Sequence, residues 1–398
     1  MKKCIVWETS VSVAGGQKMT LTVLDLLKDE YEFLCLIPGE GKLAEELKRR
    51  GIVYVCLGDQ TLPAGVKGWK AYLRYASMSI RSILKSTMVI RSFKPDVLYA
   101  PGPAALPWSA VCGSISRKPV VWHLHHLFSD GPTKKLLSYT SRWNSVRKIV
   151  SVTRVVGDQI TSPAGHDKVA PLCNPVDTAR YAAGDAEMIL RETEAALGRP
   201  VLRKGGCMLM QIAVLRPAKQ QDLFIRVVGA LKHLGVPVTG ILVGKAITEE
   251  DLRYEKQLRQ MISHEGLAGD IYMAGHRSNV QDYLAAADIV FVPMAVEGLS
   301  LVAQEAMSAK RHVVAVDAGG VAELMRDAGC GTLYPLNASP EEIAGIIQQL
   351  LRQDHREALQ RGYDFCLHHS SEAYRESISR VFASACGQHC GSDGGYRA

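Results

Sequence analysis

Short apolar runs alternate with longer amphipathic stretches along most of this 398-residue chain, and the alternation occurs in two successive series. Runs rich in β-branched residues are typical of strands that are buried on both faces. The first predicted series is Cys4–Trp7, Glu32–Ile37, Val53–Leu57, Val97–Ala100, Val120–Leu124 and Ile149–Val152. The second is Met208–Ala213, Val238–Val243, Ile271–Ala274, Ile289–Pro293, Val313–Val316 and Thr332–Tyr334. Strands separated by helices form parallel sheets, so we predict an α/β protein with two doubly wound domains.

The predicted boundary between the two domains follows the segment Asn174-Pro175-Val176-Asp177. We assign residues 1–178 to an N-terminal domain and residues 179–365 to a C-terminal domain, and we expect residues 387–398 to form a flexible tail. In doubly wound domains, ligands bind beyond the carboxyl ends of the strands. Two such domains that face each other would place a ligand site in the cleft between them.

The positive charge is concentrated in the first part of the chain. The whole chain has 47 Lys and Arg against 40 Asp and Glu, a formal net charge of +7. Residues 1–180 contain 25 basic and 14 acidic residues, whereas residues 181–398 contain 22 basic and 26 acidic residues. We therefore expect the N-terminal domain to meet an acidic partner or surface. The 47% hydrophobic and 22% charged content argues against a disordered or fibrous chain.

The start of the chain and its cysteines both favour a cytoplasmic protein. Glu8 interrupts the first apolar stretch, so we expect no secretory signal. The longest uncharged run is Val97–Ser116, but Pro101, Pro103 and Pro107 argue against a continuous membrane helix there. Several of the ten cysteines lie in apolar runs, as buried reduced thiols do in cytosolic proteins.

A basic helix is predicted within Val66–Lys94, which holds seven basic residues and no acidic one. Five of these basic residues fall within an arc of roughly 60° on a helical wheel: Lys67, Lys70, Arg74, Arg81 and Lys85. Apolar residues cluster on the opposite side: Trp69, Tyr72, Leu73, Ile80, Ile83 and Leu84. This pattern fits a solvated basic face above a core face, or a surface that meets anionic lipid or an anionic acceptor. Nucleic acid is not expected, because no recognition motif or aromatic stacking platform accompanies the charge.

The most informative stretch follows the predicted strand that ends at Pro293. A loop holds Glu297-Gly298-Leu299-Ser300, and a helix is predicted from about Ser300 to Met307. The first turn of such a helix presents free backbone N–H groups, which bind phosphate. Carboxylates bind hydroxyls, so Glu297 and Glu305 on either side of the turn indicate a phosphate ligand with hydroxyls at both ends, such as a nucleotide sugar. The alternative is that both glutamates are solvated surface residues.

A second basic element follows the strand Met208–Ala213. Arg216 and Lys219 lie in the loop after this strand, where both could neutralise a diphosphate leaving group. Ordinary surface charge is the alternative interpretation.

Histidines and glycines mark two strand ends in the N-terminal domain. His123 and His125 share one face of their predicted strand, and His126 follows at its carboxyl end. A histidine there could bond a sugar hydroxyl, although His123 also fits a core position. Three histidines suggest a metal, but no carboxylate or cysteine completes a set nearby, so we expect none. Gly15 and Gly16 follow the first strand and permit close approach of a phosphate or sugar.

In their order and context, these elements resemble the retaining glycosyltransferase family 4, which has the GT-B fold. The resemblance extends from the glycine pair to about Leu350. Glu297 and Glu305 match the E-x7-E motif of the family, and the segment Gly319-Gly320-Val321-Ala322-Glu323 resembles its Gly-Gly-x-x-Glu turn. Asn174-Pro175-Val176-Asp177 resembles its interdomain signature. The GT-B fold implies two doubly wound, Rossmann-like domains that face a central cleft.

Three positions depart from the family pattern. Val214 stands where the family often has arginine, and Gln220 stands where it has glycine. His126 follows His125 at the position where the family usually has aspartate. The nearby Arg216 is a candidate substitute for the missing arginine, because a variant with Arg-Pro-x-Lys is familiar in the family.

The resemblance implies a metal-independent hexosyltransferase with no cofactor, which uses a nucleoside diphosphate sugar as donor. Its acceptor would be a glycan, a lipid-linked molecule or a small molecule. Independently of the resemblance, the basic surplus of the N-terminal domain leads us to expect a cytoplasmic protein with peripheral contact to the inner face of an anionic membrane. The implied catalytic residues are His125, Glu297, Lys219 and Arg216. The implied donor-binding residues are Gly15, Gly16, Gly298, Leu299, Ser300, Leu301, Glu305, His276 and Arg277.

Specific roles follow from the same resemblance. Lys219 and Arg216 would stabilise the departing diphosphate together with the amides of Ser300 and Leu301. Glu297 would hold sugar hydroxyls, Glu305 the ribose, and His125 the transferred sugar. A helix within residues 366–386 would return to the N-terminal domain. Two other functions remain open: a UDP-sugar epimerase of the same fold, and a non-catalytic scaffold that binds nucleotide sugars.

Overall fold

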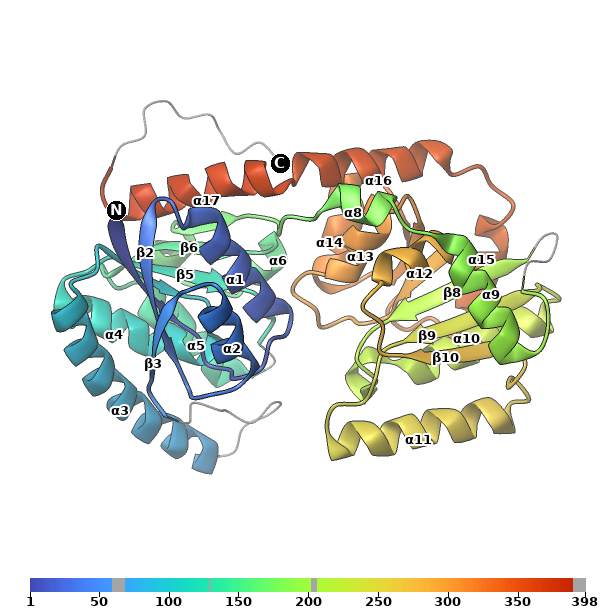
Figure 1. The fold of residues 1–398 in the computed structure, drawn as a ribbon, viewed down its shortest axis with the longest axis horizontal. Helices are drawn as coiled ribbons and strands as arrows, with labels where there is room; N and C mark the ends of the chain where they lie inside the picture. The colour runs from blue at the N-terminus through green and yellow to red at the C-terminus, as the bar shows by residue number, and fades with distance from the viewer. Residues whose placement is uncertain (59–68, 129, 202–205, 389–398) are drawn as a thin grey trace. The chain divides into compact units, whose positions relative to one another are not determined.

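The computed structural model describes residues 1–58, 69–128, 130–201 and 206–388. The chain divides into two compact units, each built around its own parallel sheet (Figure 1). The first unit is Met1–Asn174 together with the C-terminal segment that begins at Ser371, and the second is Pro175–Ser370. The chain therefore leaves the first unit at Asn174, four residues before the predicted boundary.

The first unit contains a seven-stranded parallel sheet with the strand order β3-β2-β1-β4-β5-β6-β7. Its strands are β1 (Lys2–Trp7), β2 (Tyr31–Ile37), β3 (Val53–Cys56), β4 (Val97–Ala100), β5 (Val120–Leu124), β6 (Val146–Ser151) and β7 (Val169–Pro171). All six strands predicted for this region are confirmed. The sequence analysis missed β7, because this three-residue edge strand pairs only along β6 and ends in proline, so it carries no strand-length pattern.

The second unit contains a six-stranded parallel sheet with the order β10-β9-β8-β11-β12-β13. Its strands are β8 (Cys207–Ile212), β9 (Val238–Val243), β10 (Ile271–Gly275), β11 (Ile289–Val292), β12 (His312–Val316) and β13 (Thr332–Tyr334). All six were predicted. In both sheets the strand order reverses beside the first strand, between β1 and β4 and between β8 and β11. Ligands of doubly wound folds bind at the carboxyl ends of the strands around such switch points.

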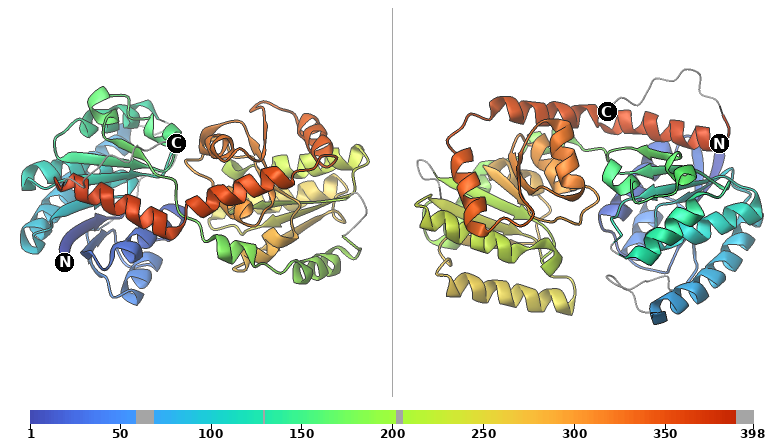
Figure 2. Two further views of the ribbon diagram at one scale, coloured as in Figure 1. Left: turned by 90° about the horizontal axis from the view of Figure 1, so that it is seen from above. Right: turned by 180° about the vertical axis from the view of Figure 1, so that it is seen from behind.

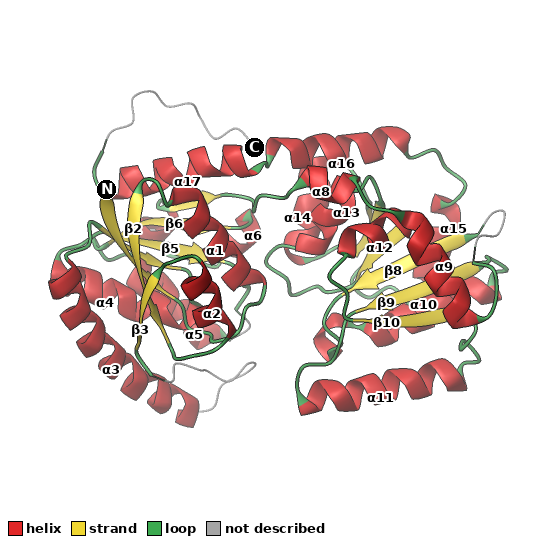
Figure 3. Cartoon of the chain, viewed as in Figure 1, coloured by secondary structure: helices red, strands yellow, loops and turns green. Residues whose placement is uncertain are grey.

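Helices flank the strands of each unit (Figure 3). The first unit has α1 (Gly15–Leu27), α2 (Lys42–Arg49), α3 (Trp69–Phe93), η1 (Pro103–Ala105), α4 (Leu106–Ser116), α5 (Gly131–Ser141), α6 (Arg154–Gly157), α7 (Pro163–His166) and α17 (Ser371–Ala385). The second has α8 (Thr178–Ala182), α9 (Ala186–Leu197), η2 (Pro217–Lys219), α10 (Gln221–His233), α11 (Glu249–His264), α12 (Val280–Ala286), α13 (Leu301–Ser308), α14 (Gly319–Ala328), α15 (Pro340–Leu350) and α16 (Arg356–His368). Within the described residues, no helix is both long and apolar enough to cross a bilayer.

The last helix, α17, belongs to the first unit although the second unit precedes it in the chain (Figure 2). Its helical spacing brings five side chains into the core of the first unit: Tyr374, Ile378, Val381, Phe382 and Ala385. The Phe382 ring lies 5.5 Å from the Tyr31 ring and 5.2 Å from the Tyr99 ring, measured between centroids. The returning helix begins at Ser371 and lies within the predicted range 366–386, whose first residues, Cys366 among them, still belong to α16 of the second unit.

The helix α3 requires a correction of the predicted core face. The side chains of Trp69, Leu73, Ile80 and Leu84 are at least 60% exposed to solvent. The residues of α3 that are buried instead are Met78, Ser82, Ser86, Thr87 and Ile90. The predicted apolar face therefore points outward, and a face rich in small polar residues packs inward. Lys67, which we placed on the basic side of this helix, lies outside the described residues.

The packing of α17 predicts a large effect of one substitution. Phe382→Ala should destabilise the first unit by about 3–5 kcal/mol, because it removes a fully buried ring between two aromatic neighbours. Native-state hydrogen exchange of the β1 and β2 amides should report this loss. Glu376→Ala, at an exposed position of the same helix, is the matched control and should change exchange little. Equal exchange rates in both variants would contradict the assigned role of α17.

Candidate functional site

The loops after β8 and β11 meet in the second unit, because these strands are neighbours at the switch point. Lys219 ends η2 in the first of these loops, and Glu297 lies in the second. The Lys219 Nζ atom donates a hydrogen bond to Glu297 Oε1 over 2.8 Å. Both side chains are about three-quarters buried, with exposed fractions of 27% and 22%. Two residues predicted for the site from separate motifs thus form one ion pair.

Two glycines hold the loop that carries Glu297. The N–H of Gly320 donates to the backbone oxygen of Glu297 over 2.9 Å. A Cβ atom built on Gly320 would lie 1.8 Å from the backbone oxygen of Gly298, a distance that no real side chain tolerates. Gly319 adopts a φ of +63°, in the left-handed region that favours glycine. The Gly-Gly pair is therefore required by the close approach of two backbone segments.

The helix α13 follows this loop and begins at Leu301. Gly298, Leu299 and Ser300 are buried, and Ser300 is the N-cap residue. Its Oγ atom accepts a hydrogen bond from the backbone N–H of Ala303 over 3.3 Å. N-capping places the first-turn N–H groups of α13, including that of Leu301, at the end of the helix where its dipole is positive. Such an end can bind a phosphate group.

Glu305 lies within α13 and contacts a residue that the sequence analysis missed. The Tyr181 hydroxyl donates to Glu305 Oε1 over 2.7 Å. Burial and the nearby Glu305 carboxylate raise the pKa of Tyr181, so its hydroxyl stays protonated and remains a donor. Tyr181 lies in α8, which Asp177 caps by accepting from the N–H of Arg180. Its position four residues after the Asn-Pro-Val-Asp segment is the signal that could have identified it.

Two glutamines brace the loop between β8 and α10. Gln211 donates from Nε2 to the backbone oxygen of Lys219 over 2.6 Å, and Gln221 donates to that of Val214 over 2.9 Å. Gln220 adopts a φ of +53°, the left-handed conformation that costs a non-glycine residue roughly 1 kcal/mol. The glycine that the family has at this position therefore corresponds to a real backbone requirement.

Arg216 does not join the Lys219–Glu297 pair. Its guanidinium binds the buried carboxylate of Asp251 with two hydrogen bonds, over 2.9 and 3.0 Å. This interaction holds the pKa of Asp251 well below its usual value. The charge of Arg216 is thus compensated by a partner in α11 that sequence spacing did not reveal.

Arg277 and His276 follow β10. Arg277 donates to the Glu192 carboxylate and to the backbone oxygen of Ala274, and it lies over the Tyr283 ring. These contacts join β10, α9 and α12, so Arg277 stabilises the packing of these three elements in the second unit. His276 is exposed beside it.

The glycine pair and the histidines come together in the first unit. Gly15 is the first residue of α1, and a Cβ atom built on Gly16 would lie 3.6 Å from His126 Nε2 and 3.9 Å from His125 Cδ2. His123 is fully buried, and its Nδ1 atom lies 2.6 Å from the Tyr99 hydroxyl, within hydrogen-bond distance. Its ring centroid is 3.9 Å from that of His125. His123 therefore lies in the core, and His125 lies at the carboxyl end of β5, as expected from the sequence.

His123 is fully buried, His125 is half-buried, and His126 is exposed at the end of the strand. Burial lowers the pKa of His123 to about 3, and it also lowers the pKa values of His125 and His126. The imidazoles are neutral at pH 7, so His125 can bond a hydroxyl but cannot supply a fixed positive charge. Its Nε2 atom is buried and has no hydrogen-bond partner among the described residues. Among all the residues that the structure describes, no group of three His, Cys, Asp or Glu side chains is arranged to hold a metal ion.

Glu8 is a further residue that the sequence analysis did not assign to the site. It follows β1 and is buried, where its carboxylate accepts hydrogen bonds from Gln17 Nε2 and Thr20 Oγ1 in α1. Burial raises the pKa of Glu8. These bonds fix the first turns of α1, and hence Gly16, against the end of β1.

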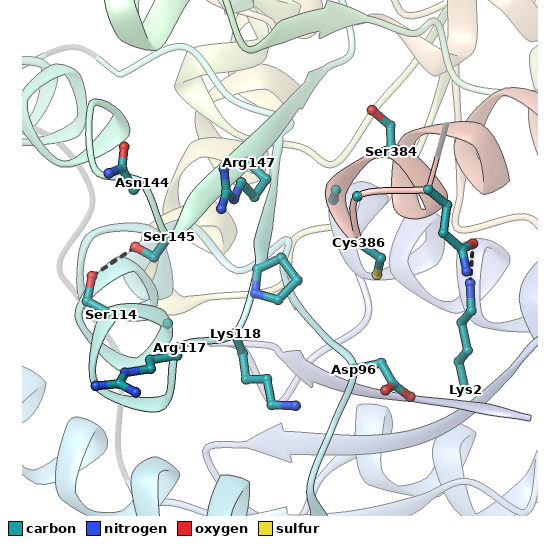
Figure 4. Close-up of a pocket in the computed structure, with 15 residues that line it drawn as sticks. Lys2, Asp96, Ser114, Arg117, Lys118, Asn144, Ser145, Arg147, Ser384 and Cys386 are labelled. Carbon is teal, nitrogen blue, oxygen red and sulfur yellow. Dashed lines mark hydrogen bonds between the residues drawn. The ribbon is translucent and has the colours of Figure 1, made fainter. Parts of the chain in front are cut away.

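A cavity of about 800 Å³ lies elsewhere in the first unit (Figure 4). Its lining includes Lys2 at the start of β1, Asp96 before β4, and Pro119 before β5. It therefore lies at the amino edge of the sheet, whereas His125 lies at the carboxyl edge. Two of its lining residues are hydrogen-bonded, since the Lys2 Nζ atom donates to Gln388 Oε1 over 2.6 Å. This cavity is separate from the candidate site.

Two family models match the chain. The model of glycosyl transferases group 1 matches residues 197–362, and that of Glycosyltransferase Family 4 matches residues 26–180. The chain belongs to glycosyltransferase family 4. Each matched region contains most of one parallel sheet, so each unit of this family 4 protein is matched by one of the two models.

Known relatives match parts of this family 4 chain. The lipopolysaccharide core biosynthesis mannosyltransferase LpsB of Rhizobium meliloti (strain 1021) is 33% identical over 135 residues, which cover 34% of this chain and 37% of LpsB. A D-inositol 3-phosphate glycosyltransferase of Mycobacterium leprae is 28% identical over 211 residues, which cover 52% of this chain and 44% of that protein. The chain thus spans less than half the length of either relative in these matches.

Solved structures match over nearly the whole chain. HepE of Anabaena, solved in complex with UDP, has a TM-score of 0.77 at 21% identity, covering 96% of this chain and 100% of that chain. The lipopolysaccharide outer core galactosyltransferase WaaB, in its apo form, has a TM-score of 0.70 at 13% identity, covering 96% and 99%. The GT-B fold predicted from the sequence is confirmed by this likeness.

The contact at Gly320 predicts a steric effect. Gly320→Ala should destabilise the second unit by about 2 kcal/mol or more and displace the Glu297 loop, because the new Cβ would overlap the Gly298 oxygen. Gly345→Ala is the matched control, since a Cβ there meets nothing within 4 Å and α15 favours alanine by roughly 0.5–1 kcal/mol. Urea unfolding measures both. Equal midpoints for the two variants would contradict the requirement for glycine.

The burial of His123 predicts a dependence of stability on pH. Its pKa falls from 6.5 to about 3 on folding, so protonation favours the unfolded chain, and stability present above pH 6.5 is lost as the pH falls. At pH 5 this histidine should cost about 2 kcal/mol relative to pH 7.5. His123→Gln should remove that part of the difference in unfolding free energy. His264→Gln, at an exposed position, should retain the wild-type difference, and an unchanged difference in His123→Gln would contradict the assignment.

Proposed function

We propose that this protein is a retaining, metal-independent hexosyltransferase that transfers a sugar from a nucleoside diphosphate sugar to a glycan, lipid-linked or small-molecule acceptor. The observation that carries the proposal is the ion pair between Lys219 and Glu297 beside the N-terminus of α13. A cation, a carboxylate and free helix amides together suit a ligand that carries both phosphates and hydroxyls. A nucleotide sugar is such a ligand.

The proposed roles in the second unit follow from the chemistry of each group. Lys219 and the first-turn amides of α13 stabilise the charge that develops on the departing diphosphate, which is the role a metal has in other transferases. Glu297 accepts hydrogen bonds from sugar hydroxyls, and Glu305 from the ribose. Arg216 keeps its pair with Asp251 and would have to leave that carboxylate to act on the diphosphate, whereas Tyr181 positions Glu305.

The first unit supplies the acceptor side in this proposal. His125 is neutral and has a buried ring nitrogen without a protein partner among the described residues, so it can bond a sugar hydroxyl. Gly15 and Gly16 leave room beside it. Glu8 is hydrogen-bonded to Gln17 and Thr20, which makes it a positioning residue. Retention at the anomeric carbon follows from front-face attack, with a donor phosphate oxygen taking the acceptor proton.

The comparisons favour the same class of reaction. HepE has been solved with UDP and with UDP-glucose, and LpsB is named as a mannosyltransferase of lipopolysaccharide core biosynthesis. We therefore propose a role in polysaccharide or glycoconjugate biosynthesis, in the cytoplasm at the inner face of a membrane. His276 and Arg277, beyond β10, mark the proposed position of the nucleotide base.

Substitution of the ion pair tests the function. Glu297→Gln and Lys219→Ala should each lower kcat by roughly a hundredfold or more while the fold persists, because each removes a group that acts on the reacting sugar phosphate. The measurement is transfer from a panel of UDP-, GDP-, ADP- and dTDP-sugars to glycan and lipid-linked acceptors. Glu265→Gln and Lys256→Ala, at exposed positions on and beside α11, are the matched controls and should retain full activity.

Further outcomes decide between the functions. Nuclear magnetic resonance of the product should show the donor's anomeric configuration, and added EDTA should leave the rate unchanged. A new UDP-sugar formed without any acceptor would instead identify an epimerase. Donor binding without transfer or hydrolysis would identify a scaffold. Full activity in either folded variant of the ion pair would contradict the proposed site.

A further inference from the structure

The helix α3 exposes a row of large apolar side chains. The exposed fractions are between 60% and 68% for each member, and the row is Trp69, Leu73, Ile80, Leu84 and Met88. Their spacing of four and seven residues places them on one side of the helix. At 1.5 Å per residue, the row extends over roughly 28 Å. We call these five residues the apolar row.

Contacts on the other side of α3 fix the apolar row in its outward orientation. The Tyr72 hydroxyl donates to Asp130 Oδ1, and the Tyr75 hydroxyl donates to the backbone oxygen of Ala104, each over 3.0 Å. Near the other end of the helix, Trp7 donates from Nε1 to Ser86 Oγ, also over 3.0 Å. Rotating the helix to bury the apolar row would break these bonds. The tertiary contacts of the first unit therefore fix the apolar row in its exposed orientation.

Basic side chains accompany the apolar row along the helix. Four of its members are each followed directly by an exposed basic residue, and these are Lys70, Arg74, Arg81 and Lys85. Consecutive residues are about 100° apart, so the basic residues line one flank of the apolar row. The helix has no acidic residue between Trp69 and Phe93. The Lys70 Nζ atom lies 5.9 Å from the Trp69 ring centroid, and Lys85 Nζ donates to the backbone oxygen of Leu57.

We propose that the apolar row and its basic flank dock the first unit on an anionic lipid bilayer. An interfacial helix buries large apolar side chains, tryptophan among them, at the boundary of headgroups and acyl chains, while Lys and Arg contact lipid phosphates. The charge is complementary to anionic lipid along the whole row. A bilayer also accepts exposed apolar side chains without a surface of matching shape, whereas a protein partner would need a complementary surface. The helix lies in the interface, since it is not apolar enough to span it.

The direction of α3 gives the docking a consequence for the acceptor. The helix joins β3 to β4, so its N-terminal end lies at the carboxyl edge of the sheet, where His125 follows β5. Trp69 and Leu73 are at that end. If the proposed transferase function holds, His125 lies at the same edge of the sheet as the end of α3 that contacts the bilayer, which favours a lipid-linked acceptor. The docking itself does not depend on the transferase function.

Binding to vesicles tests the docking with the full chain and no donor. The wild type should sediment with vesicles of phosphatidylcholine and phosphatidylglycerol, and much less with phosphatidylcholine alone. The triple variant Leu73→Ser, Ile80→Ser, Leu84→Ser should bind the anionic vesicles at least tenfold more weakly. The matched control changes three equally exposed residues of the second unit: Ile247→Ser, Leu252→Ser and Leu336→Ser. This control should bind as the wild type does.

Two further measurements test the basic flank and the tryptophan of the apolar row separately. Lys70→Gln with Arg81→Gln should weaken binding to anionic vesicles and reduce its salt dependence. Vesicles should shift the tryptophan emission to the blue, and Trp69→Phe should abolish that shift, because three of the four other tryptophans are buried.

Clear outcomes would overturn the proposal. It fails if the wild type does not bind anionic vesicles, or if the triple variant of the apolar row binds them as strongly as the wild type does. It also fails if the wild type is a dimer that the triple variant converts to a monomer, since the apolar row would then be a protein interface. Transfer to a water-soluble acceptor, measured separately, should be unchanged in the triple variant, so a failure of docking is distinguishable from a failure of the proposed function.

Discussion

The backbone contact between the start of α14 and the Glu297 loop is the constraint on which the second unit's site depends. The N–H of Gly320 donates to the backbone oxygen of Glu297. Because Gly320 has no Cβ atom, the backbone oxygen of Gly298 can lie close to it. The loop is thereby held at the carboxyl edge of the sheet, where the Glu297 carboxylate meets Lys219 from the neighbouring strand end. Gln211 in turn holds the backbone of Lys219. Backbone geometry, rather than a mobile side-chain network, therefore sets the spacing of the charged groups.

The two units use the same topology to build different electrostatic environments. In the second unit, opposite charges are paired and partly exposed, as in Lys219 with Glu297 and Arg216 with Asp251. In the first unit, His123 and His125 are desolvated and neutral. A paired cation can be released to a diphosphate, whereas a neutral imidazole suits an uncharged hydroxyl. The division matches the donor and acceptor roles that we propose.

Sequence reasoning predicted what depends on local pattern and topology. Buried strands reveal themselves as apolar runs, and adjacency of β8 and β11 makes it predictable that Lys219 and Glu297 lie near each other. The parts that it missed depend on partners distant in sequence. Asp251 lies 35 residues from Arg216, and Tyr181 lies 124 residues from Glu305. The outward face of α3 was misjudged because an apolar stripe normally packs inward, and only tertiary hydrogen bonds decide otherwise.

The position of α17 has a consequence for the order in which the chain can fold during synthesis. The core of the first unit needs Phe382, yet the ribosome must first complete all of Pro175–Ser370 before that residue emerges. Until then, the surface around Tyr31 and Tyr99 lacks its cover. The second unit is continuous in sequence and can close its own core first. The first unit therefore stays incomplete until the end of synthesis, and its uncovered apolar surface is open to chaperones and to aggregation during that time.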